Sequence, residues 1–443
     1  MKDLTKGKEY KLILKFALPM LLGNVFQQLY NIIDSVIVGN YLGKQALAAV
    51  GASFPIIFLL MSLIIGVAIG STILISQYFG AKQYENIRKA VDTINIVLFV
   101  TAILFGVIGS VFSEEIFILI KLPADVLPAA SNYLQIYFMG LPAFFGFQGI
   151  SAILRGVGDS KTPLYFLIIA TIANILLDLL FVVVFKTGIE GVAYATIIAQ
   201  GGAFITAVIW VGKYNKLLSY RIFNIKFDKE IFFKSLKIGL PSGFQMLIVS
   251  LGMMAIYAIV NKFGTTVIAA YSAALRIDSL ATLPAMMFSN ALSTFVGQNI
   301  GAQRFDRVKK GFVSTLIMTS ILSIIITFII VLFGESMMNM FIDDREVVRI
   351  GHEYLVIVSS FYILFAIMFT SNAVMRGAGD TVIPMFITLI ALWVVRIPSA
   401  YYFGVEWGEI GVWWSMPIAW AIGMTLSLIY YSTGRWKLKT IVK

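Results

Sequence analysis

The sequence predicts an all-α integral membrane protein with twelve transmembrane helices in two parallel six-helix repeats. Three observations support this fold class. Of the 443 residues, 59% are hydrophobic and only 13% are charged, whereas a soluble domain carries about 25% charged residues. Apolar runs that reach or exceed the roughly 20 residues needed to cross a bilayer follow one another along the chain. The same sequence pattern also occurs twice, at a nearly constant offset of 221 residues, the spacing from Arg155 to Arg376.

Each half of the chain divides into six apolar segments. We expect transmembrane helices near residues 12–38, 46–78, 91–113, 131–152, 162–186 and 189–212, and then near 233–260, 267–298, 311–333, 352–373, 382–403 and 410–432. Because six is an even number, both halves enter the membrane from the same side, as parallel repeats related by an axis along the membrane normal. The expected domains are an N-terminal lobe over residues 1–212, a linker over 213–232 and a C-terminal lobe over 233–443.

The basic residues predict the orientation. Most Lys and Arg lie at both termini, in alternate connections between the expected helices, and around the linker. The positive-inside rule therefore places both termini and the linker in the cytoplasm, as expected for a multi-pass protein of the inner membrane of a prokaryote. This bias accounts for most of the formal net charge of +11, so the charge indicates no nucleic-acid partner.

Polar residues inside the expected spans are the candidates for function. They share one face of the first helix (Asn24, Gln27, Asn31 and Asp34), of the fifth (Thr171, Asn174 and Asp178) and of the sixth (Thr196 and Gln200). An ionised carboxylate at membrane depth is costly unless it is protonated, ion-paired or bound to a cation, so both Asp residues are predicted to be functional. Hydrogen bonding between helices is the alternative use of such groups, and we favour it for Asn24, Thr171 and Gln200.

The second half does not repeat this acid chemistry. At the positions that correspond to Asn and Asp of the fifth helix it has Val395 and Ser399, and Arg396 lies in the same expected helix. Two roles stay open for Arg396: it holds an anion or repels cations, or it is a structural pairing partner. Arg276 and Asp278 are the other charged residues within its spans, and they are too close in sequence to share a helix face.

Prolines occupy matching positions in the two halves. Pro19 and Pro241 each lie near the start of the first helix of their half. A proline inside a helix removes a backbone hydrogen bond and allows bending. Because Pro19 is on the helix that carries Asp34, we expect its bend to be coupled to the charge of that residue; a static kink is the alternative.

The pattern Arg-Gly-x-Gly-Asp occurs once in each half, at 155–159 and 376–380. Gly-x-Gly-Asp is also found in intramembrane aspartyl proteases, but here it lies at a helix end and a Pro follows the Asp by four residues. A turn with glycine at positive φ and Asp capping the next helix explains it. The sequence contains no His-Glu-x-x-His, P-loop or Cys, so we expect no enzyme activity, and any uphill transport must use an ion gradient.

These features together resemble the MATE family of multidrug and toxic compound extrusion transporters. The resemblance rests on the twelve expected spans, the two Arg-Gly-x-Gly-Asp turns, and the matching signatures at 77–81 and 298–302, which share Gln and Gly-Ala. It extends over essentially the whole chain. It implies a MATE-like fold, with V-shaped N- and C-lobes around a central cleft, and a bend at Pro19.

Within this family the chain is most similar to the DinF-like branch, whose acids cluster in the N-terminal lobe. The residues that match the cation site of that branch are Asp34, Asn174, Asp178 and Thr196. The resemblance implies that these four residues bind the coupling ion, H⁺ or Na⁺. The substrate cleft is expected to involve Gln27, Asn31, Tyr133 and Arg396. The chain departs from the Na⁺-coupled NorM-like branch, which keeps acids in the C-terminal lobe.

The sequence therefore predicts a secondary-active antiporter that exports amphipathic organic cations in exchange for H⁺, or for Na⁺, by alternating access between two lobes. We expect small-molecule drugs as partners, no cofactor, and a monomer in the lipid bilayer. A lipid or lipid-linked saccharide flippase of the same superfamily is the alternative, and a cationic cleft near Arg276 and Arg396 would favour it. A membrane-embedded enzyme is disfavoured because the sequence offers no catalytic constellation.

Overall fold

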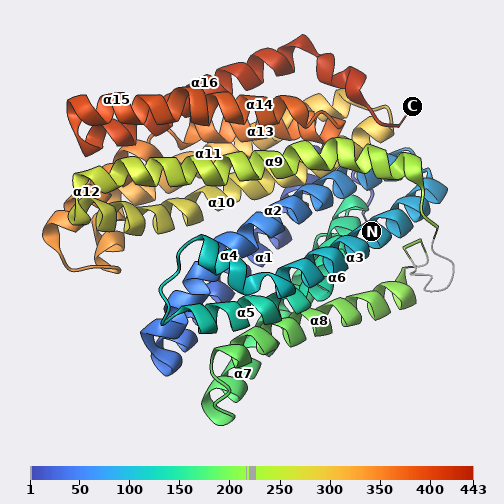
Figure 1. Ribbon diagram of the computed structural model, residues 1–443. Coiled ribbons are helices and arrows are strands. Elements are labelled where there is room, and N and C mark those ends of the chain that lie inside the picture. Colours follow the sequence, from blue (N-terminus) through green and yellow to red (C-terminus); the bar gives the residue numbers. More distant parts are fainter. Residues whose placement is uncertain (1, 216, 219–225, 443) are drawn as a thin grey trace. The chain divides into compact units, whose positions relative to one another are not determined.

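The computed structural model describes residues 2–215, 217–218 and 226–442, and every regular element in these ranges is a helix (Figure 1). The elements of the first half are α1 (Glu9–Ile37), η1 (Val38–Leu42), α2 (Gly43–Gly80), α3 (Tyr84–Val111), α4 (Ser113–Leu119), α5 (Leu127–Met139), α6 (Leu141–Gly156), α7 (Lys161–Asp178), η2 (Leu179–Val184) and α8 (Ile189–Tyr214). Part of the expected linker lies outside the described residues; α8 extends into its start and α9 into its end.

The second half has a similar order of elements. Its elements are α9 (Lys229–Val260), η3 (Asn261–Phe263), α10 (Thr265–Gly301), α11 (Phe305–Asn339), α12 (Arg345–Ser359), α13 (Tyr362–Ala378), α14 (Val382–Leu389), η4 (Ile390–Arg396), α15 (Ile397–Trp407), α16 (Glu409–Thr433) and η5 (Arg435–Lys439). Three of the short elements, η1, η2 and η4, are π-helical, and they continue directly into or out of α-helices. The chain is therefore all-α in the part that the structure describes, as predicted.

The helices have the length and composition of membrane spans. Nine helices within the described ranges meet this test, and up to eleven do when two bent pairs are each counted as one span. The bent pairs, α5 with α6 and α12 with α13, each turn by 49°. The first candidate runs over 72 residues, Glu9–Gly80, and has room for two spans because about 20 residues cross a bilayer. The twelve expected spans all fall within these helices to within a few residues.

The outer helix surfaces are apolar. In α11, the side chains of Ile321, Ile324 and Phe328 are all more than half exposed. Soluble monomers rarely expose large contiguous apolar patches. These side chains mark the surface that faces lipid.

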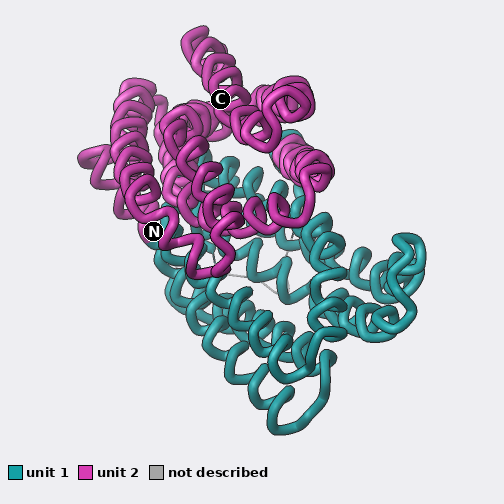
Figure 2. Tube along the Cα trace, turned by 90° about the vertical axis from the view of Figure 1, so that its left-hand side faces the viewer, with its two compact units in different colours: residues 1–2, 19–240 teal, residues 3–18, 241–443 magenta. Residues whose placement is uncertain are grey.

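The chain folds into two compact units, each of which is described by itself (Figure 2). Unit 1 comprises Met1–Lys2 and Pro19–Leu240, and unit 2 comprises Asp3–Leu18 and Pro241–Lys443. One boundary therefore falls inside α1 and the other inside α9, each next to a proline within the helix. The first helix of each half begins in one unit and continues in the other.

The glycines of the repeated Arg-Gly-x-Gly-Asp pattern allow close helix packing within each unit. A Cβ atom on Gly156 would lie 3.1 Å from the carbonyl oxygen of Thr72, and one on Gly377 would lie 2.5 Å from that of Ser293. Thr72 and Ser293 are themselves separated by the repeat offset of 221 residues. The same close approach between two helices is thus built twice.

The second glycine and the Asp of the pattern form the turn that the sequence predicts. Gly158 and Gly379 have φ of 81° and 95°, the left-handed region that favours glycine. Asp159 Oδ1 accepts the backbone N–H groups of residues 161 and 162, at 3.2 and 3.1 Å, and so caps α7. In the second copy, Asp380 accepts instead from the hydroxyl of Tyr430 at 2.5 Å. The pattern is structural in both units.

We expect Gly377→Ala to destabilise the protein by about 1–3 kcal/mol, the usual cost of overpacking, because the added methyl group would meet Ser293 and Val296. Gly202→Ala in α8 is the matched control, since no atom lies within 4 Å of its Cβ position and Ala favours a helix over Gly. The thermal unfolding midpoint of each detergent-solubilised variant, followed by circular dichroism, measures the difference. Equal midpoints would contradict the packing role.

Candidate functional site

The four residues predicted to bind the coupling ion all lie in unit 1. Asp34 is on α1, Asn174 and Asp178 are on α7, and Thr196 is on α8. All four side chains are buried, and Asp178 is completely so. Asp178 is the last residue of α7, where the π-helical segment η2 begins. Such departures from α-helical geometry are frequent at functional sites.

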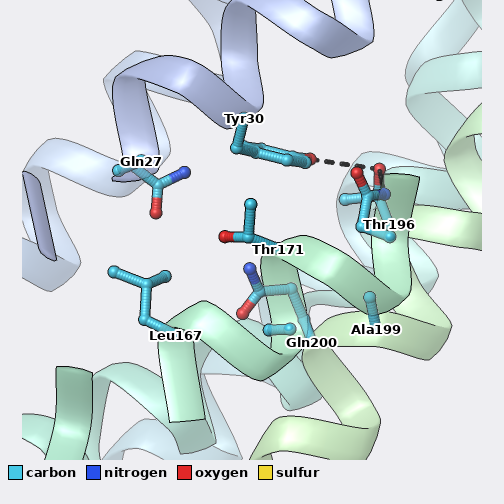
Figure 3. A pocket seen from close by; sticks show the side chains of 9 residues that line it. Gln27, Tyr30, Leu167, Thr171, Thr196, Ala199 and Gln200 are labelled. Atoms are coloured by element: carbon cyan, nitrogen blue, oxygen red, sulfur yellow. Dashed lines mark hydrogen bonds between the residues drawn. The ribbon is translucent and has the colours of Figure 1, made fainter. Parts of the chain in front are cut away.

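Side chains from the three helices contact one another at this site. Asn174 Nδ2 donates to Thr196 Oγ1 at 3.4 Å, and the hydroxyl of Tyr30 lies 3.3 Å from the same Oγ1 (Figure 3). The carboxyl groups of Asp34 and Asp178 interact with each other. The structure therefore brings together the four residues that the sequence places on three separate helices.

Most of the carboxyl and amide oxygens of this site lack partners in the part of the chain that the structure describes. Among the described residues, Asp34 Oδ1, Asn174 Oδ1 and both carboxylate oxygens of Asp178 are buried without a hydrogen-bond partner. No ion pair between described residues includes either Asp. An ionised carboxylate only accepts hydrogen bonds, and two buried carboxylates of one site cannot both stay ionised at low cost unless a proton or a cation neutralises their charge. The unpartnered atoms that could bind an ion here are all oxygens, which suits a proton or a hard cation such as Na⁺.

A narrow pocket adjoins this site within unit 1. Figure 3 shows its lining, in which Gln27 and Tyr30 of α1 point toward side chains of α7 and α8. Its polar lining residues are Gln27, Tyr30, Thr171, Asn174, Thr196 and Gln200. Two of them also belong to the predicted ion site. It is therefore a narrow, polar-lined crevice beside the predicted ion site.

The residues expected to line the substrate cleft have different surroundings. Gln27 lines the pocket. Tyr133 is buried on α5. Asn31 is exposed on α1, and the structure does not bring it to the pocket.

Tyr30 is a site residue that the sequence analysis missed. Its hydroxyl contacts Thr196, and the ring borders the pocket (Figure 3). It precedes Asp34 by four residues, which places both on one face of α1. That spacing could have identified Tyr30 as a site residue. A tyrosine in an apolar span usually has a packing role, however, so the spacing alone was not decisive.

The charged residues of unit 2 form a separate buried group. Tyr362 donates to Asp278 Oδ1 at 2.6 Å. Arg396 is only 8% exposed, and no ion pair between described residues joins it to Asp278. Arg276 instead is exposed and lies over the ring of Phe341. Tyr362 is therefore the direct hydrogen-bond partner of Asp278, and the two roles that the sequence leaves open for Arg396 both stay open.

Comparison with known proteins identifies the class of the chain. The MatE family profile matches residues 19–180 and again 241–402, so each match begins at one of the two boundary prolines. The "Probable multidrug resistance protein YpnP" of Bacillus subtilis is 35% identical over 436 residues, which are 98% of this chain and 97% of that protein. The "Probable multidrug resistance protein NorM" of Thermotoga maritima is 27% identical and covers 98% of this chain and 94% of its own.

Solved structures share the fold. The crystal structure of MATE in the bent conformation superimposes with a TM-score of 0.90 at 22% identity, over 98% of this chain and 96% of that one. An outward-facing MATE transporter of the MOP superfamily gives a TM-score of 0.89 at 21% identity, over 99% of both chains. The fold is thus that of the MATE transporters. The chain belongs to the MatE family.

Proposed function

We propose that this protein is a secondary-active efflux antiporter that exports amphipathic organic cations in exchange for H⁺, with Na⁺ as the alternative coupling ion. The observation that carries the proposal is the pair of buried carboxyl groups Asp34 and Asp178, of which Asp34 Oδ1 and both oxygens of Asp178 lack a hydrogen-bond partner among the described residues. Loading a proton or a cation changes the charge buried in unit 1. A ligand that binds one of two conformations more tightly shifts the protein toward it, which is what ion-driven transport requires.

The same charges explain why drug and ion would exchange. A cationic drug and the coupling ion are both attracted to the two carboxylates, so binding of one weakens binding of the other. Aromatic rings near the site, those of Tyr30 and Tyr133, add favourable contacts for a flat organic cation. In this proposal Gln27 and Asn31 also contact the substrate from unit 1, and Arg396 contributes from unit 2. The names of the relatives, which describe multidrug resistance, support this substrate class.

We assign the protein to the DinF-like branch of the family, because both acids of its ion site are in the first half. The basic residues support an orientation with both termini in the cytoplasm. We further propose that a single chain is the working unit in the inner membrane of a prokaryote, since one unit by itself holds the complete ion site.

Efflux of ethidium from proteoliposomes tests the proposal. A pH gradient and a Na⁺ gradient are imposed separately, with protein orientation checked by proteolysis. We expect efflux under the pH gradient. Efflux under the Na⁺ gradient but not under the pH gradient would identify Na⁺ as the coupling ion. If folded, oriented protein moves no ethidium under either gradient, the antiporter proposal is wrong and movement of a fluorescent lipid, assayed in the same vesicles, would support the flippase alternative.

A further inference from the structure

The short helix η5, which follows α16, is held against unit 2 by Trp436. This residue is 3% exposed; its ring is stacked on that of Tyr431 with 5.8 Å between the centroids, and its Nε1 donates to the carbonyl oxygen of Tyr431 at 3.1 Å. The ring of Tyr431 is stacked in turn on that of Phe312 in α11, at 4.3 Å. At the end of η5, the carbonyl oxygen of Lys439 lies 3.2 Å from the position that a Cβ atom on Gly379 would take. These contacts fix the orientation of η5 and thereby the side chains that it exposes.

The exposed side chains of η5 are three basic residues and one leucine. Leu438 is 83% exposed, and Arg435, Lys437 and Lys439 are exposed as well. No ion pair between described residues includes any of the three basic residues. A single exposed leucine is ordinary on a protein surface, but basic residues around an apolar side chain and next to a tryptophan are typical of segments that lie in the membrane interface. η5 therefore has the composition of an interfacial segment.

The neighbouring helix α11 contributes a fourth basic residue. Phe312 contacts Tyr431 at the end of α16, and Lys309 precedes Phe312 by three residues, which places both on one side of α11. Lys309 is exposed and has no ion pair among the described residues. The acidic residue Asp380 contacts the end of α16 but is buried, and it accepts from the hydroxyl of Tyr430. We refer to the four cations and the leucine, Lys309, Arg435, Lys437, Leu438 and Lys439, as the basic surface.

We propose that the basic surface binds the headgroup of an anionic phospholipid, with Leu438 inserted beside the acyl chains. α16 is a candidate membrane span of 25 residues that ends at Thr433. Because about 20 residues cross the hydrocarbon core, η5 lies at the level of the headgroups. The ammonium and guanidinium groups of the basic surface donate to the phosphate oxygens.

An anionic lipid fits this surface better than an acidic soluble protein does. In the proposed orientation the surface faces the cytoplasmic leaflet, whose anionic lipids attract basic residues next to a span. A lipid supplies both a negative headgroup for the four cations and an apolar environment for Leu438, whereas an acidic protein would match the charges alone. The inference goes beyond the proposed transport function, in which η5 has no role.

Quenching by brominated lipids tests this inference at the surface itself. The chain contains no Cys, so Ser432→Cys, at an exposed position three residues before Arg435, introduces a unique thiol for a bimane fluorophore. The labelled full-length protein is placed in phosphatidylcholine nanodiscs in which a small share of the lipid is replaced by dibrominated phosphatidylglycerol or by dibrominated phosphatidylcholine. Bromine quenches nearby fluorophores, so the ratio of the two quenching curves measures the local preference for the anionic headgroup. We expect a preference for phosphatidylglycerol that weakens as salt is added.

Two further variants examine the lysines and the leucine separately. Lys437→Gln with Lys439→Gln should lower the preference for phosphatidylglycerol by up to about 25-fold, since each basic residue near an anionic surface contributes about fivefold. In the second variant the bimane is attached at Leu438→Cys. Both brominated lipids should quench it, because the bromine atoms are on the acyl chains.

Lys82→Gln with Arg88→Gln is the matched control. Both residues are exposed in unit 1, so this double variant removes the same charge from another part of the chain. Gln is compatible with position 82, because the equivalent Gln303 has the same φ of 58° as Lys82. We expect its preference for phosphatidylglycerol to equal that of the native chain. Equal thermal unfolding midpoints in phosphatidylcholine nanodiscs show that all variants are folded.

Four results would overturn the inference. Equal quenching by the two brominated lipids in the otherwise native chain would show that the surface does not select an anionic lipid. An equal loss of preference in the control would assign the preference to the overall charge of the protein. A label at position 438 that neither lipid quenches would exclude the insertion of Leu438. If inorganic phosphate removed the preference while sodium chloride of the same ionic strength did not, the surface would be a site for free phosphate. None of these measurements involves transport, so they are independent of the proposed antiport.

Discussion

Replacing Asp178 by Asn is expected to abolish gradient-driven ethidium efflux without unfolding the protein. The Asp178 carboxyl group is completely buried, interacts with Asp34 and has no partner for either oxygen among the described residues. Asn has the same shape as a protonated Asp and cannot release or accept a proton, so the site would stay in its loaded state. Coupling energies of about 1–3 kcal/mol correspond to about 5- to 150-fold, and we expect a loss toward the upper end of this range.

The stability of this variant should move in the opposite direction from its activity. A buried carboxylate without a partner destabilises the folded state, so a neutral amide should leave the unfolding midpoint unchanged or raise it. Asp125→Asn is the matched control, since it makes the same chemical change at an exposed turn residue. Efflux under a pH gradient, efflux under a Na⁺ gradient and the thermal midpoint are measured for both variants. Efflux at the native rate in Asp178→Asn would show that Asp178 is not part of the coupling step.

The sequence predicts the helices well because each must supply about 20 apolar residues by itself. It predicts the bends less well. The break between α5 and α6 falls at Gly140, two residues before Pro142. The glycine and the proline give this break a local cause in the sequence. The equivalent break between α12 and α13 has the same angle but no proline near it. Its cause lies in tertiary packing rather than in local sequence.

The exchange of the first-helix segments could not be predicted from hydropathy. The charge and hydropathy of residues 3–18 suit packing on the first half as well as packing on the second, so they do not indicate which of the two the segment packs against. Their position depends on contacts nearly 300 positions away, such as that of Leu4 with Gln298 and that of Glu9 with Arg307. The repeated signature indicated that these positions matter, but not that one of them binds the N-terminal segment.

The candidate ion site was accessible to sequence reasoning because helical spacing alone places its polar residues on inward faces. Asp34, Asn174 and Asp178 are costly at membrane depth and therefore conspicuous. Tyr30 was not conspicuous, because tyrosine is common in apolar helices and only its contact with Thr196 shows a polar role. Spacing identifies which residues face inward, and the structure is needed to show which of them meet.

The buried charges of unit 2 give the largest expected effect on stability. Arg396 and Asp278 are 8% and 6% exposed, and Tyr362 donates to Asp278 Oδ1 at 2.6 Å. We expect Asp278→Asn to destabilise the protein by about 3–5 kcal/mol, because the variant leaves a buried guanidinium group without a compensating charge. Arg396→Met should cost less, about 1–3 kcal/mol, since the hydroxyl of Tyr362 still donates to the carboxylate.

The double variant Asp278→Asn with Arg396→Met separates pairing from packing. If the two charges compensate each other, the double variant should recover most of the stability lost in Asp278→Asn, because replacing both members of a buried pair is often close to neutral. The double-mutant cycle is measured by chemical unfolding of the native protein, the two single variants and the double variant in detergent, monitored by tryptophan fluorescence. Trp413 is stacked on Tyr271 in the same core and reports on the packing of that core. Strictly additive losses would mean that Arg396 is not the partner of Asp278. In that case the guanidinium group, whose Nε has no hydrogen-bond partner among the described residues, would be free to act on a substrate, and the anion-binding role that the sequence left open for Arg396 would become the better explanation of its place in the membrane.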